Sequence, residues 1–433
     1  MRKILKRGLL ILGIVIACTV MGSAGEPVAK AGSYTHRGVW VAFYEFYSAG
    51  LSNRTEAAFR KNAEKMFKKI SDYGCNEVYF HVRAFDDAIY PSKIVGWSKY
   101  LSTDGRALPY DPLKILVELA HAQNLKLHAW MNPYRVTTDK ILDPAKKKTI
   151  KRIVNQVKEI IDNYEVDGIH FDDYFYLGDS YSHVKASTRR KKVNKMVKAV
   201  HDAVKEKSES LEFGISPAGN YEYCMSIGAD VKTWLSEPGY IDYIIPQIYW
   251  SDVYKMNGKM TKLYSERLAL WQEANKIDLP MYIGLGLYRA GKGVSPDYGW
   301  SRSNSNLRDQ ARLLKSGNCE GYTLFAYSDI DSSEARKEMK NFLEEIAWIK
   351  LNKSKVTLSA GETFQLEPTW MPMKYEGDDD FQFESSDESI ATVDETGLVT
   401  PVADSGTVKI WVESGEKKKA CTITIGMGGI IRE

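Results

Sequence analysis

The chain has 433 residues, of which 44% are hydrophobic, and its formal net charge is +3. This length predicts two or three domains, and the apolar content is sufficient for a large core. The 59 basic and 56 acidic residues nearly balance, and they form no basic patch that would indicate a nucleic-acid-binding protein. The basic run at residues 189–192 is expected on the solvated face of a helix.

Residues 1–31 are typical of an export signal. Four basic residues precede an apolar run over residues 8–20, which is too short for a membrane-spanning helix. Removal of the signal would change the net charge from +3 to about −1. The segment around Cys18 also resembles a lipoprotein signal, although the apolar residues after Cys18 favour a plain secretion signal. We therefore expect an extracytoplasmic protein, either secreted or held at the cell surface, where a lipid on Cys18 is one means of attachment.

Eight short β-like runs alternate with helical segments across residues 32–348. The runs are residues 37–44, 77–83, 126–132, 166–174, 212–218, 242–250, 281–288 and 321–328. Between them, apolar residues recur at helical spacing, as at Ala63, Met66, Phe67 and Ile70. Eight repeats of strand and helix predict an α/β fold, a closed (β/α)8 TIM barrel. An open doubly wound sheet is less favoured, because no glycine-rich phosphate turn follows the first run.

The character of the sequence changes across residues 349–433. Helical periodicity ends, and short alternating runs appear at residues 355–359, 363–367, 381–384, 390–393, 407–412 and 420–425. Runs of this length between turn-forming residues predict a small all-β Ig-like sandwich after the barrel.

Two adjacent carboxylates, Asp172 and Asp173, close the fourth predicted strand. Alternation along that strand directs His170 and Asp172 into the barrel lumen and brings Asp173 to its mouth. Placing two acids together raises the pKa of at least one, and cleavage of a glycosidic bond requires an acid that holds its proton near neutral pH. We expect Asp172 and Asp173 to be catalytic. The alternative is that they cap the next helix or pair with a structural arginine.

Glycoside cleavage also needs a second carboxylate or the acetamido group of the substrate itself. Adjacent strand residues point in opposite directions, so Asp172 and Asp173 cannot easily flank one sugar from two sides. In one mechanism Asp173 is the general acid, and Asp172 raises its pKa and orients the acetamido group. In the other, the second carboxylate is Asp87, Glu222 or Asp252, each of which follows a strand end.

Side chains suited to binding a sugar also follow the predicted strand ends, where barrel enzymes build their sites. The candidates are His81, Arg83, Asn132, Tyr134, Arg135, His170, Tyr174, Asn220, Gln247, Tyr249, Trp250 and Tyr288. Either arginine could hold substrate oxygens or act as a counter-ion to the acids. Trp250 is expected to be the better platform for a sugar ring, whereas Trp130, inside a strand, is expected to pack in the core.

No metal or cofactor is expected. His81, His128 and His170 lie on separate strands without metal-ligand spacing. The four cysteines after the signal are scattered, and they are expected to be mostly buried free thiols, although an exported chain could pair two of them. They are Cys75, Cys224, Cys319 and Cys421.

The predicted barrel resembles the glycosyl-hydrolase-like 10 family of exported bacterial proteins. The resemblance runs from about residue 37 to residue 346 and is carried, in order, by residues 37–40, 81–83, 87–92, 97–98, 128–135, the Asp172–Asp173 segment, 215–217 and 246–250. It implies a barrel that acts on cell-wall or related polysaccharide, such as the glycan strands of peptidoglycan. Residues 383–394 and 397–400 similarly resemble the bacterial Ig-like group 2 module, which implies attachment or spacing at the cell surface.

Three functions remain open at this point. The first is an exported glycoside hydrolase that acts on a polysaccharide. The second is a non-catalytic glycan-binding surface protein, because the fourth-strand motif has no Glu where many barrel glycosidases carry one. The third, metal-dependent deacetylation of the same polymer, is disfavoured by the missing metal-ligand spacing.

Overall fold

A computed structural model describes residues 34–176, 181–315 and 319–426. The predicted export signal, residues 1–31 with Cys18, lies outside these described residues. Within the described ranges, no helix combines the length and the apolar character needed to cross a membrane.

Eight parallel strands form the barrel. They are β1 (His36–Val41), β2 (Glu77–Arg83), β5 (Lys126–Met131), β6 (Gly168–Asp172), β7 (Glu212–Ser216), β8 (Tyr243–Ile244), β11 (Tyr282–Leu285) and β12 (Gly321–Leu324). Their order is β11-β12-β1-β2-β5-β6-β7-β8, and parallel bridges from Ile244 to Met281 and from Gln247 to Gly284 join β8 to β11. The predicted (β/α)8 barrel is therefore confirmed. β8 is shorter than predicted because Pro246 has no N–H to continue its ladder.

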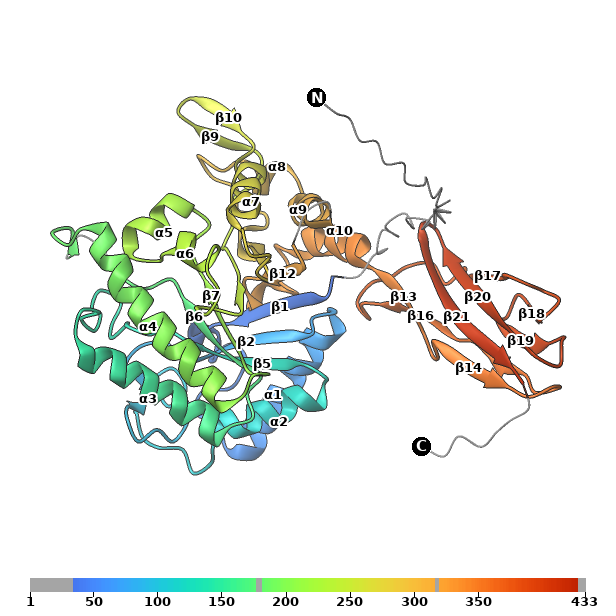
Figure 1. Ribbon diagram of the computed structural model, residues 1–433, viewed down its shortest axis with the longest axis horizontal. Coiled ribbons are helices and arrows are strands. Elements are labelled where there is room, and N and C mark those ends of the chain that lie inside the picture. The colour runs from blue at the N-terminus through green and yellow to red at the C-terminus, as the bar shows by residue number, and fades with distance from the viewer. Residues whose placement is uncertain (1–33, 177–180, 316–318, 427–433) are drawn as a thin grey trace, which may run out of the picture. The chain divides into compact units, whose positions relative to one another are not determined.

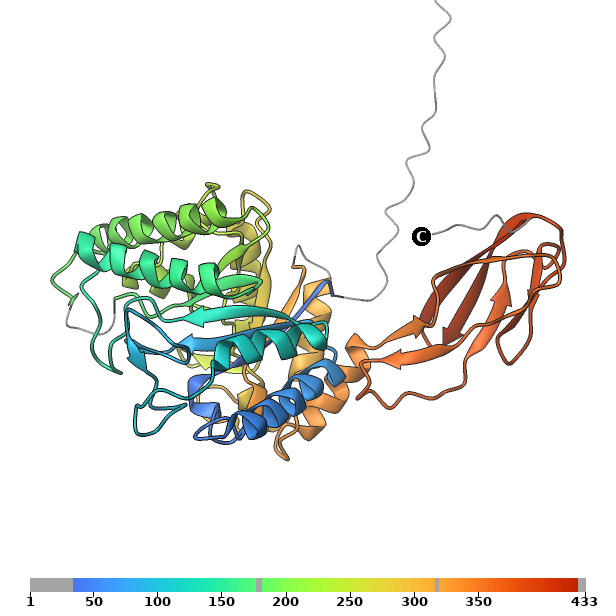
Figure 2. The ribbon, with the colours of Figure 1, turned by 90° about the horizontal axis from the view of Figure 1, so that it is seen from below.

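Helices surround the strands (Figure 1). They are α1 (Glu56–Asp72), α2 (Pro112–Ala122), α3 (Lys147–Asn163), α4 (Ala186–Lys207), α5 (Tyr221–Ile227), α6 (Val231–Trp234), α7 (Leu263–Ala274), α8 (Gly299–Arg302), α9 (Asn306–Lys315) and α10 (Arg336–Ile346). Figures 1 and 2 show α3 and α4 side by side outside the strands. α1 buries Ala63, Met66, Phe67 and Ile70 against the barrel, as its spacing predicted.

Local sequence signals position two of these helices. Thr55 accepts a hydrogen bond from the backbone N–H of Ala58 at the start of α1, and Asp111 accepts one from Lys114 at the start of α2. Pro112 occupies the first turn of α2, where its missing N–H costs nothing. These caps fix where the loops after β1 and β2 end.

The lumen is filled by side chains of alternating strand residues. Trp40, Tyr79, Trp130, Tyr243 and Tyr282 form one buried cluster there, separate from the apolar core between strands and helices. Gly214 makes room for this filling, because a Cβ at that position would come within 2.1 Å of the Tyr243 ring. On β6, Ile169 and Phe171 belong to the outer core, so His170 and Asp172 face the lumen as predicted.

Short additional elements lie in the loops at the carboxyl ends of the strands. They are the 3-10 helices η1 (Phe43–Glu45), η3 (Leu287–Arg289) and η4 (Tyr327–Asp329), and the strand pairs β3 (Asp87–Ala88) with β4 (Gly96–Trp97) and β9 (Tyr254–Met256) with β10 (Lys259–Thr261).

The C-terminal part consists of small sheets around a second core. Its strands are β13 (Trp348–Leu351), β14 (Lys355–Leu358), β15 (Phe364–Gln365), β16 (Pro368–Met371), β17 (Gln382–Ser385), β18 (Ala391–Val393), β19 (Leu398–Pro401), β20 (Gly406–Ser414) and β21 (Lys417–Ile425). One sheet has the order β14-β21-β20-β17, another β15-β19-β18, and β13 pairs with β16. Ile410, Val412 and Ile423 are among the residues that fill the core.

Candidate active site

The Asp172–Asp173 pair lies at the carboxyl end of β6. Asp172 is only 6% exposed, and its Oδ1 accepts hydrogen bonds from the backbone N–H of Asp173 at 2.8 Å and from Nε2 of Gln247 at 3.1 Å. The same Gln247 nitrogen donates to the carbonyl oxygen of Ser216 at 3.0 Å. Gln247 therefore holds one carboxylate oxygen of Asp172 in place. Gln247 is itself positioned by the segment after β8 and by its hydrogen bond to β7.

Burial controls the protonation of the pair. It raises the pKa of Asp172, against the opposing hydrogen bonds from Asp173 and Gln247. Burial and the charge of Asp172 raise the pKa of Asp173 well above its usual range. Arg135 opposes both shifts only weakly, and neither aspartate forms an ion pair within the part of the chain that the structure describes. The pair therefore retains a proton at pH values where a free aspartate has lost it.

A pocket of about 220 Å³ opens above Asp172. Its lining includes six of the predicted residues, namely His81, Arg135, Asp172, Tyr174, Gln247 and Tyr249. Asp173 is not among the lining residues. It lies toward α5, where burial and the charge of Asp173 raise the pKa of Cys224.

Aromatic rings form most of the pocket wall. Trp130 stacks on His81 with ring centroids 3.8 Å apart, and Tyr249 stacks on Phe325 at 5.5 Å. Trp130 packs in the buried lumen cluster, as expected, and also lines the pocket, whereas Trp250 does not line it. The reason is alternation: Trp130 is an inward-facing residue of β5, whereas Trp250 follows the end of its strand and packs against the apolar core.

His170 supports the pocket floor from below and does not line the pocket. Its Nε2 accepts a hydrogen bond from Nε1 of Trp40 at 3.2 Å, so Nδ1 carries the ring proton toward the Tyr243 hydroxyl, 3.1 Å away. That hydroxyl in turn lies 3.0 Å from Nδ1 of His128, within hydrogen-bond distance. Burial, together with neighbouring histidines, holds the pKa of His170 well below its usual range, and the ring is neutral.

Three predicted binding residues do not line the pocket and make contacts elsewhere. Arg83 is fully buried, where it donates to the backbone carbonyl of Asn132 and pairs with Asp86 at 3.1 Å. Asn132 is also fully buried and donates to the carbonyl oxygen of Ala84 at 2.9 Å. Tyr134 is buried with its ring edge-to-face on Phe175. Arg83 and Asn132 thus join the loops after β2 and β5, and they do not face the pocket.

Two further candidates lie outside the pocket lining. Asn220 is the N-cap of α5, with its Oδ1 3.0 Å from the backbone N–H of Tyr223. Tyr288 packs edge-to-face against Tyr249 and Phe325 behind the pocket wall. Tyr288 therefore supports the wall from outside, and Asn220 fixes the start of α5.

None of the three candidate second carboxylates lines the pocket. Asp87 accepts a hydrogen bond from the backbone N–H of Phe85 at 3.0 Å, which shapes the loop after β2. Glu222 is exposed and pairs with Arg267 at 2.8 Å. Asp252 accepts from the backbone N–H of Ser265 at 2.8 Å, in the first turn of α7. Each carboxylate already has a structural partner, because each follows its strand by enough residues to reach a neighbouring loop or helix.

Besides Trp130, five lining residues were absent from the sequence-based site. They are Trp40, Phe43, Tyr44, Ser216 and Phe325. Trp40 and Ser216 belong to segments that carried the family resemblance, and both are inward-facing residues near the ends of β1 and β7. Applying to every strand the alternation used for β6 would have found them.

The described residues offer no cluster of three or more histidine, cysteine, aspartate or glutamate side chains placed to hold a metal ion. The described cysteines, Cys75, Cys224, Cys319 and Cys421, are all buried and unpaired, as predicted.

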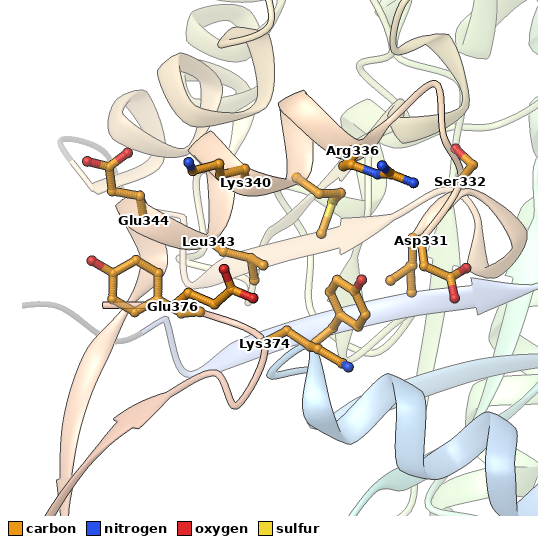
Figure 3. A pocket seen from close by; sticks show the side chains of 12 residues that line it. Asp331, Ser332, Arg336, Lys340, Leu343, Glu344, Lys374 and Glu376 are labelled. Carbon is orange, nitrogen blue, oxygen red and sulfur yellow. The ribbon is translucent and has the colours of Figure 1, made fainter. Parts of the chain in front are cut away.

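A larger cavity of about 680 Å³ lies elsewhere, lined by α10, the loop before it and residues 374–376 (Figure 3). Its charged side chains nearly balance, and they include Asp331, Arg336, Lys340, Glu344, Lys374 and Glu376. None of its lining residues belongs to a barrel strand. It therefore lacks the features of the pocket at the strand ends.

Comparison with known sequences supports the resemblance seen in the motifs. Residues 35–141 and 181–302 match the sequence model of the family glycosyl hydrolase-like 10, and residues 346–423 match the bacterial Ig-like domain (group 2). The glycosyl hydrolase DigH of Escherichia coli (strain K12) is 28% identical over 370 residues, which cover 67% of this chain and 82% of that protein. The glycosyl hydrolase YngK of Bacillus subtilis (strain 168) is 28% identical over 340 residues, which cover 63% of this chain and 64% of that protein.

Among solved structures, the PgaB (BpsB) glycoside hydrolase domain from Bordetella bronchiseptica superposes with a TM-score of 0.51 at 10% identity, covering 71% of this chain and 98% of that one. At this identity the match supports the barrel fold alone. Asp172 and Asp173 lie between the two segments matched by the family model. The matched segments confirm the predicted class, glycoside hydrolase, and the chain belongs to the glycosyl hydrolase-like 10 family, with a bacterial Ig-like group 2 domain at its C-terminal end.

Proposed function

We propose that this protein is an exported glycoside hydrolase that cleaves glycosidic bonds within a polysaccharide. The proposed substrate is the glycan strands of peptidoglycan, and Asp172 and Asp173 form the acid–base pair. One observation carries the proposal: Asp172 lines a pocket walled by aromatic rings, and Asp173 directly beside it gives the pair a retained proton. These are the two elements that protonation of a glycosidic oxygen and binding of a sugar ring require.

The pocket favours a sugar as the bound group. Its volume of about 220 Å³ is below the ~300–1,000 Å³ range typical of small-molecule sites, which suits one ring of a longer chain. Flat faces of Trp130 and Tyr249 can cover the apolar face of a pyranose. Arg135, Gln247 and Ser216 supply polar atoms for the hydroxyl and amide groups around the ring.

The pair can deliver a proton in two linked steps. The proton held by Asp173 passes to Asp172, which faces the pocket and delivers it to the leaving oxygen. The bond between the anomeric carbon and that oxygen breaks. Water later supplies the hydroxyl group on the new reducing end, and its other proton returns to the pair. This order places Asp172 next to the substrate, although the sequence alone suggested Asp173 as the direct acid.

Stabilisation of the developing positive charge falls to the substrate. Asp87, Glu222 and Asp252 all have structural partners outside the pocket, and Asp172 is the only acidic residue among the described residues that line it. An acetamido group next to the anomeric carbon can supply the missing oxygen. A polymer of N-acetylated sugars, such as the glycan of peptidoglycan, carries that group.

Export and surface attachment complete the proposal. The basic and apolar segments within residues 1–31 would direct the chain out of the cytoplasm, and a lipid on Cys18 is one way of holding it at the membrane. The Ig-like domain would hold or space the barrel near the cell wall. Recovery of the wild type in the membrane fraction, and of Cys18→Ser in the soluble fraction, would identify the lipid.

The experiment that tests the function is incubation of the purified protein with peptidoglycan glycans, with and without their peptides, followed by mass analysis. New reducing ends are expected from the wild type, and none from Asp172→Asn or Asp173→Asn. Equal release by both variants would remove the pair from the mechanism. Binding without fragments would instead indicate a non-catalytic glycan-binding protein, and loss of acetyl mass would indicate deacetylation.

A further inference from the structure

Aromatic side chains continue outward from the pocket along the loops that follow β1, β2 and β4. Phe43 lines the pocket, and its ring centroid lies 5.3 Å from Tyr44, 5.3 Å from Phe85 and 4.4 Å from Tyr100. Phe85 and Tyr100 do not line the pocket. We call Phe43, Tyr44, Phe85 and Tyr100 the outer aromatic cluster. It adds ring surface next to the pocket on the side of β1 and β2.

Part of this cluster is exposed to solvent. Tyr44 is 53% exposed and Tyr100 is 40% exposed, while Phe43 between them is half-buried. Single exposed aromatic residues are ordinary, but neighbouring ones beside a pocket mark a surface that a ligand covers. Phe43 contacts both tyrosines, so their rings form one continuous surface with the pocket wall.

Hydrogen bonds between two loops hold the cluster in place. The backbone N–H of Asn53 donates to the carbonyl oxygen of Leu101 at 2.9 Å, and Ser52 Oγ donates to that of Tyr100 at 2.5 Å. Asn53 and Thr103 exchange two further bonds, at 2.9 and 3.0 Å. The loop after β1 is thereby tied to the loop that carries Tyr100. A surface fixed in this way loses little conformational freedom when a ligand binds.

Arg135 joins the cluster to the carboxylate pair. Its guanidinium lies 4.9 Å from the Phe85 ring centroid and 4.1 Å from that of Tyr174, and it lines the pocket. Arg135 forms no ion pair among the residues that the structure describes, so no carboxylate competes with oxygen atoms of a ligand for its N–H donors. An apolar ligand would leave this charge without a partner, whereas a sugar offers hydroxyl oxygens as well as an apolar face.

We propose that the outer aromatic cluster binds a second sugar ring of the same glycan strand, next to the ring held in the pocket. The inference rests on the proposed function and extends that function, because it assigns chains of several sugars as the substrate. The ring in the pocket contacts Asp172, and its neighbour stacks on Tyr100 and Tyr44. The enzyme then distinguishes long strands from short ones by this contact.

The test compares binding of two peptide-free ligands, the monosaccharide N-acetylhexosamine and its β-1,4-linked hexasaccharide, by isothermal titration calorimetry. We expect the wild type to bind the hexasaccharide more tightly. Tyr100→Ala should weaken hexasaccharide binding by about 3- to 10-fold while leaving monosaccharide binding unchanged. Tyr100→Phe, which keeps the ring, should retain most of the affinity. Tyr47→Ala is the matched control, because Tyr47 is a 79% exposed tyrosine close to Tyr44 in the chain, with no ring contact to the cluster among the described residues.

Equal affinity of the wild type for the monosaccharide and the hexasaccharide, no binding of either, or an unchanged hexasaccharide affinity in Tyr100→Ala would overturn the inference. An equal loss in Tyr47→Ala would do so as well, because it would show a general surface effect. Cleavage is measured separately on the hexasaccharide. If Asp172→Asn binds the hexasaccharide like the wild type and the wild type cleaves nothing, the proposed function fails while the second ring site stands.

Discussion

The two ends of the barrel lumen each bury carboxylates, and they hold them in opposite protonation states. At the base, Glu77 lies within 3.2 Å of His36, 3.4 Å of His128 and 3.6 Å of Lys126. Burial alone would raise its pKa, but the charges and hydrogen bonds of His36 and His128 lower the pKa of Glu77 well below its usual range. At the mouth, Asp172 has no such partner among the described residues, and burial raises its pKa.

The difference shows that neighbouring side chains, and not how deeply an acid is buried, decide the protonation state of a buried acid in this fold. A carboxylate surrounded by basic side chains is fixed in its charged form and can only stabilise the structure. A carboxylate that faces a second acid and a few N–H donors can gain and lose a proton near neutral pH. The chain of hydrogen bonds from Trp40 through His170 and Tyr243 to His128 connects these two ends.

The largest expected effect is loss of activity at the mouth. Asp172→Asn should reduce kcat/KM by about 10²- to 10⁴-fold, because the amide cannot deliver a proton. The free energy of unfolding should not fall, since the substitution removes an acid that burial disfavours. Steady-state release of reducing ends and urea unfolding, measured on the same preparation, check both expectations. A variant with half the wild-type activity would contradict the assignment.

The second expected effect is a loss of stability at the base. Glu77→Gln should lower the free energy of unfolding by about 3–5 kcal/mol, because it leaves buried basic groups without their partner. The control is Glu118→Gln, which removes an exposed pair with Arg60 and should cost at most about 1 kcal/mol. Urea unfolding of the two variants at neutral pH checks the comparison.

Glu77→Gln should also change how the free energy of unfolding depends on pH. A lowered pKa contributes stability above the unfolded value of about 4.3 and loses it as pH falls below that value. The wild type should therefore lose stability in acid more steeply than Glu77→Gln. Identical acid profiles would show that Glu77 does not hold its charge in the folded state.

Eight strand–helix repeats were sufficient to predict the barrel, and alternation along the fourth strand was sufficient to predict the inward direction of Asp172. It could not predict which polar residues after the strand ends turn into the pocket, because loop conformation decides this. Arg83 and Asn132 both follow the pattern of binding residues, yet each is used to satisfy backbone carbonyls between neighbouring loops. Asp252 likewise follows a strand end, but it accepts a hydrogen bond from the first turn of α7, which comes later in the chain.

The C-terminal strands show a similar limit. β13 follows α10 almost directly, and its residues Trp348–Leu351 continue an apolar run that begins within the helix. The change from helical to extended structure becomes clear only through pairing with β16, which is distant in sequence. Neither strand was among the predicted runs.

A smaller effect is expected at Glu45, which lies beside the mouth. This residue is 2% exposed, and its two oxygens accept the backbone N–H groups of Ala42 and Ser328, each at 2.6 Å. Burial raises its pKa to about 7 despite these bonds. Between pH ~4.3 and about 7 the folded chain holds a proton that the unfolded chain has lost, so stability falls as pH rises through this window.

Glu45→Gln should remove this dependence. The difference in unfolding free energy between wild type and variant should decline by up to about 1.4 kcal/mol per pH unit across the window and become constant above it. Urea unfolding at a series of pH values measures the slope. A constant difference over the whole range would show that Glu45 is charged in the folded state throughout.

The smallest effect is expected at Glu222. This variant tests whether a carboxylate at the rim, outside the pocket at the mouth of the lumen, takes part in catalysis. Glu222 follows the fifth strand as a candidate catalytic carboxylate would, but it is exposed and paired with Arg267 at 2.8 Å. Hydrogen bonding to its own backbone N–H and the charge of Arg267 lower its pKa, so it is ionised near neutral pH and has no proton to give. Glu222→Gln should therefore leave kcat/KM within about twofold of the wild type and change stability by less than about 1 kcal/mol. If this variant instead loses activity as Asp172→Asn does, the second carboxylate lies at the rim, and the substrate's own acetamido group is not needed to stabilise the transition state.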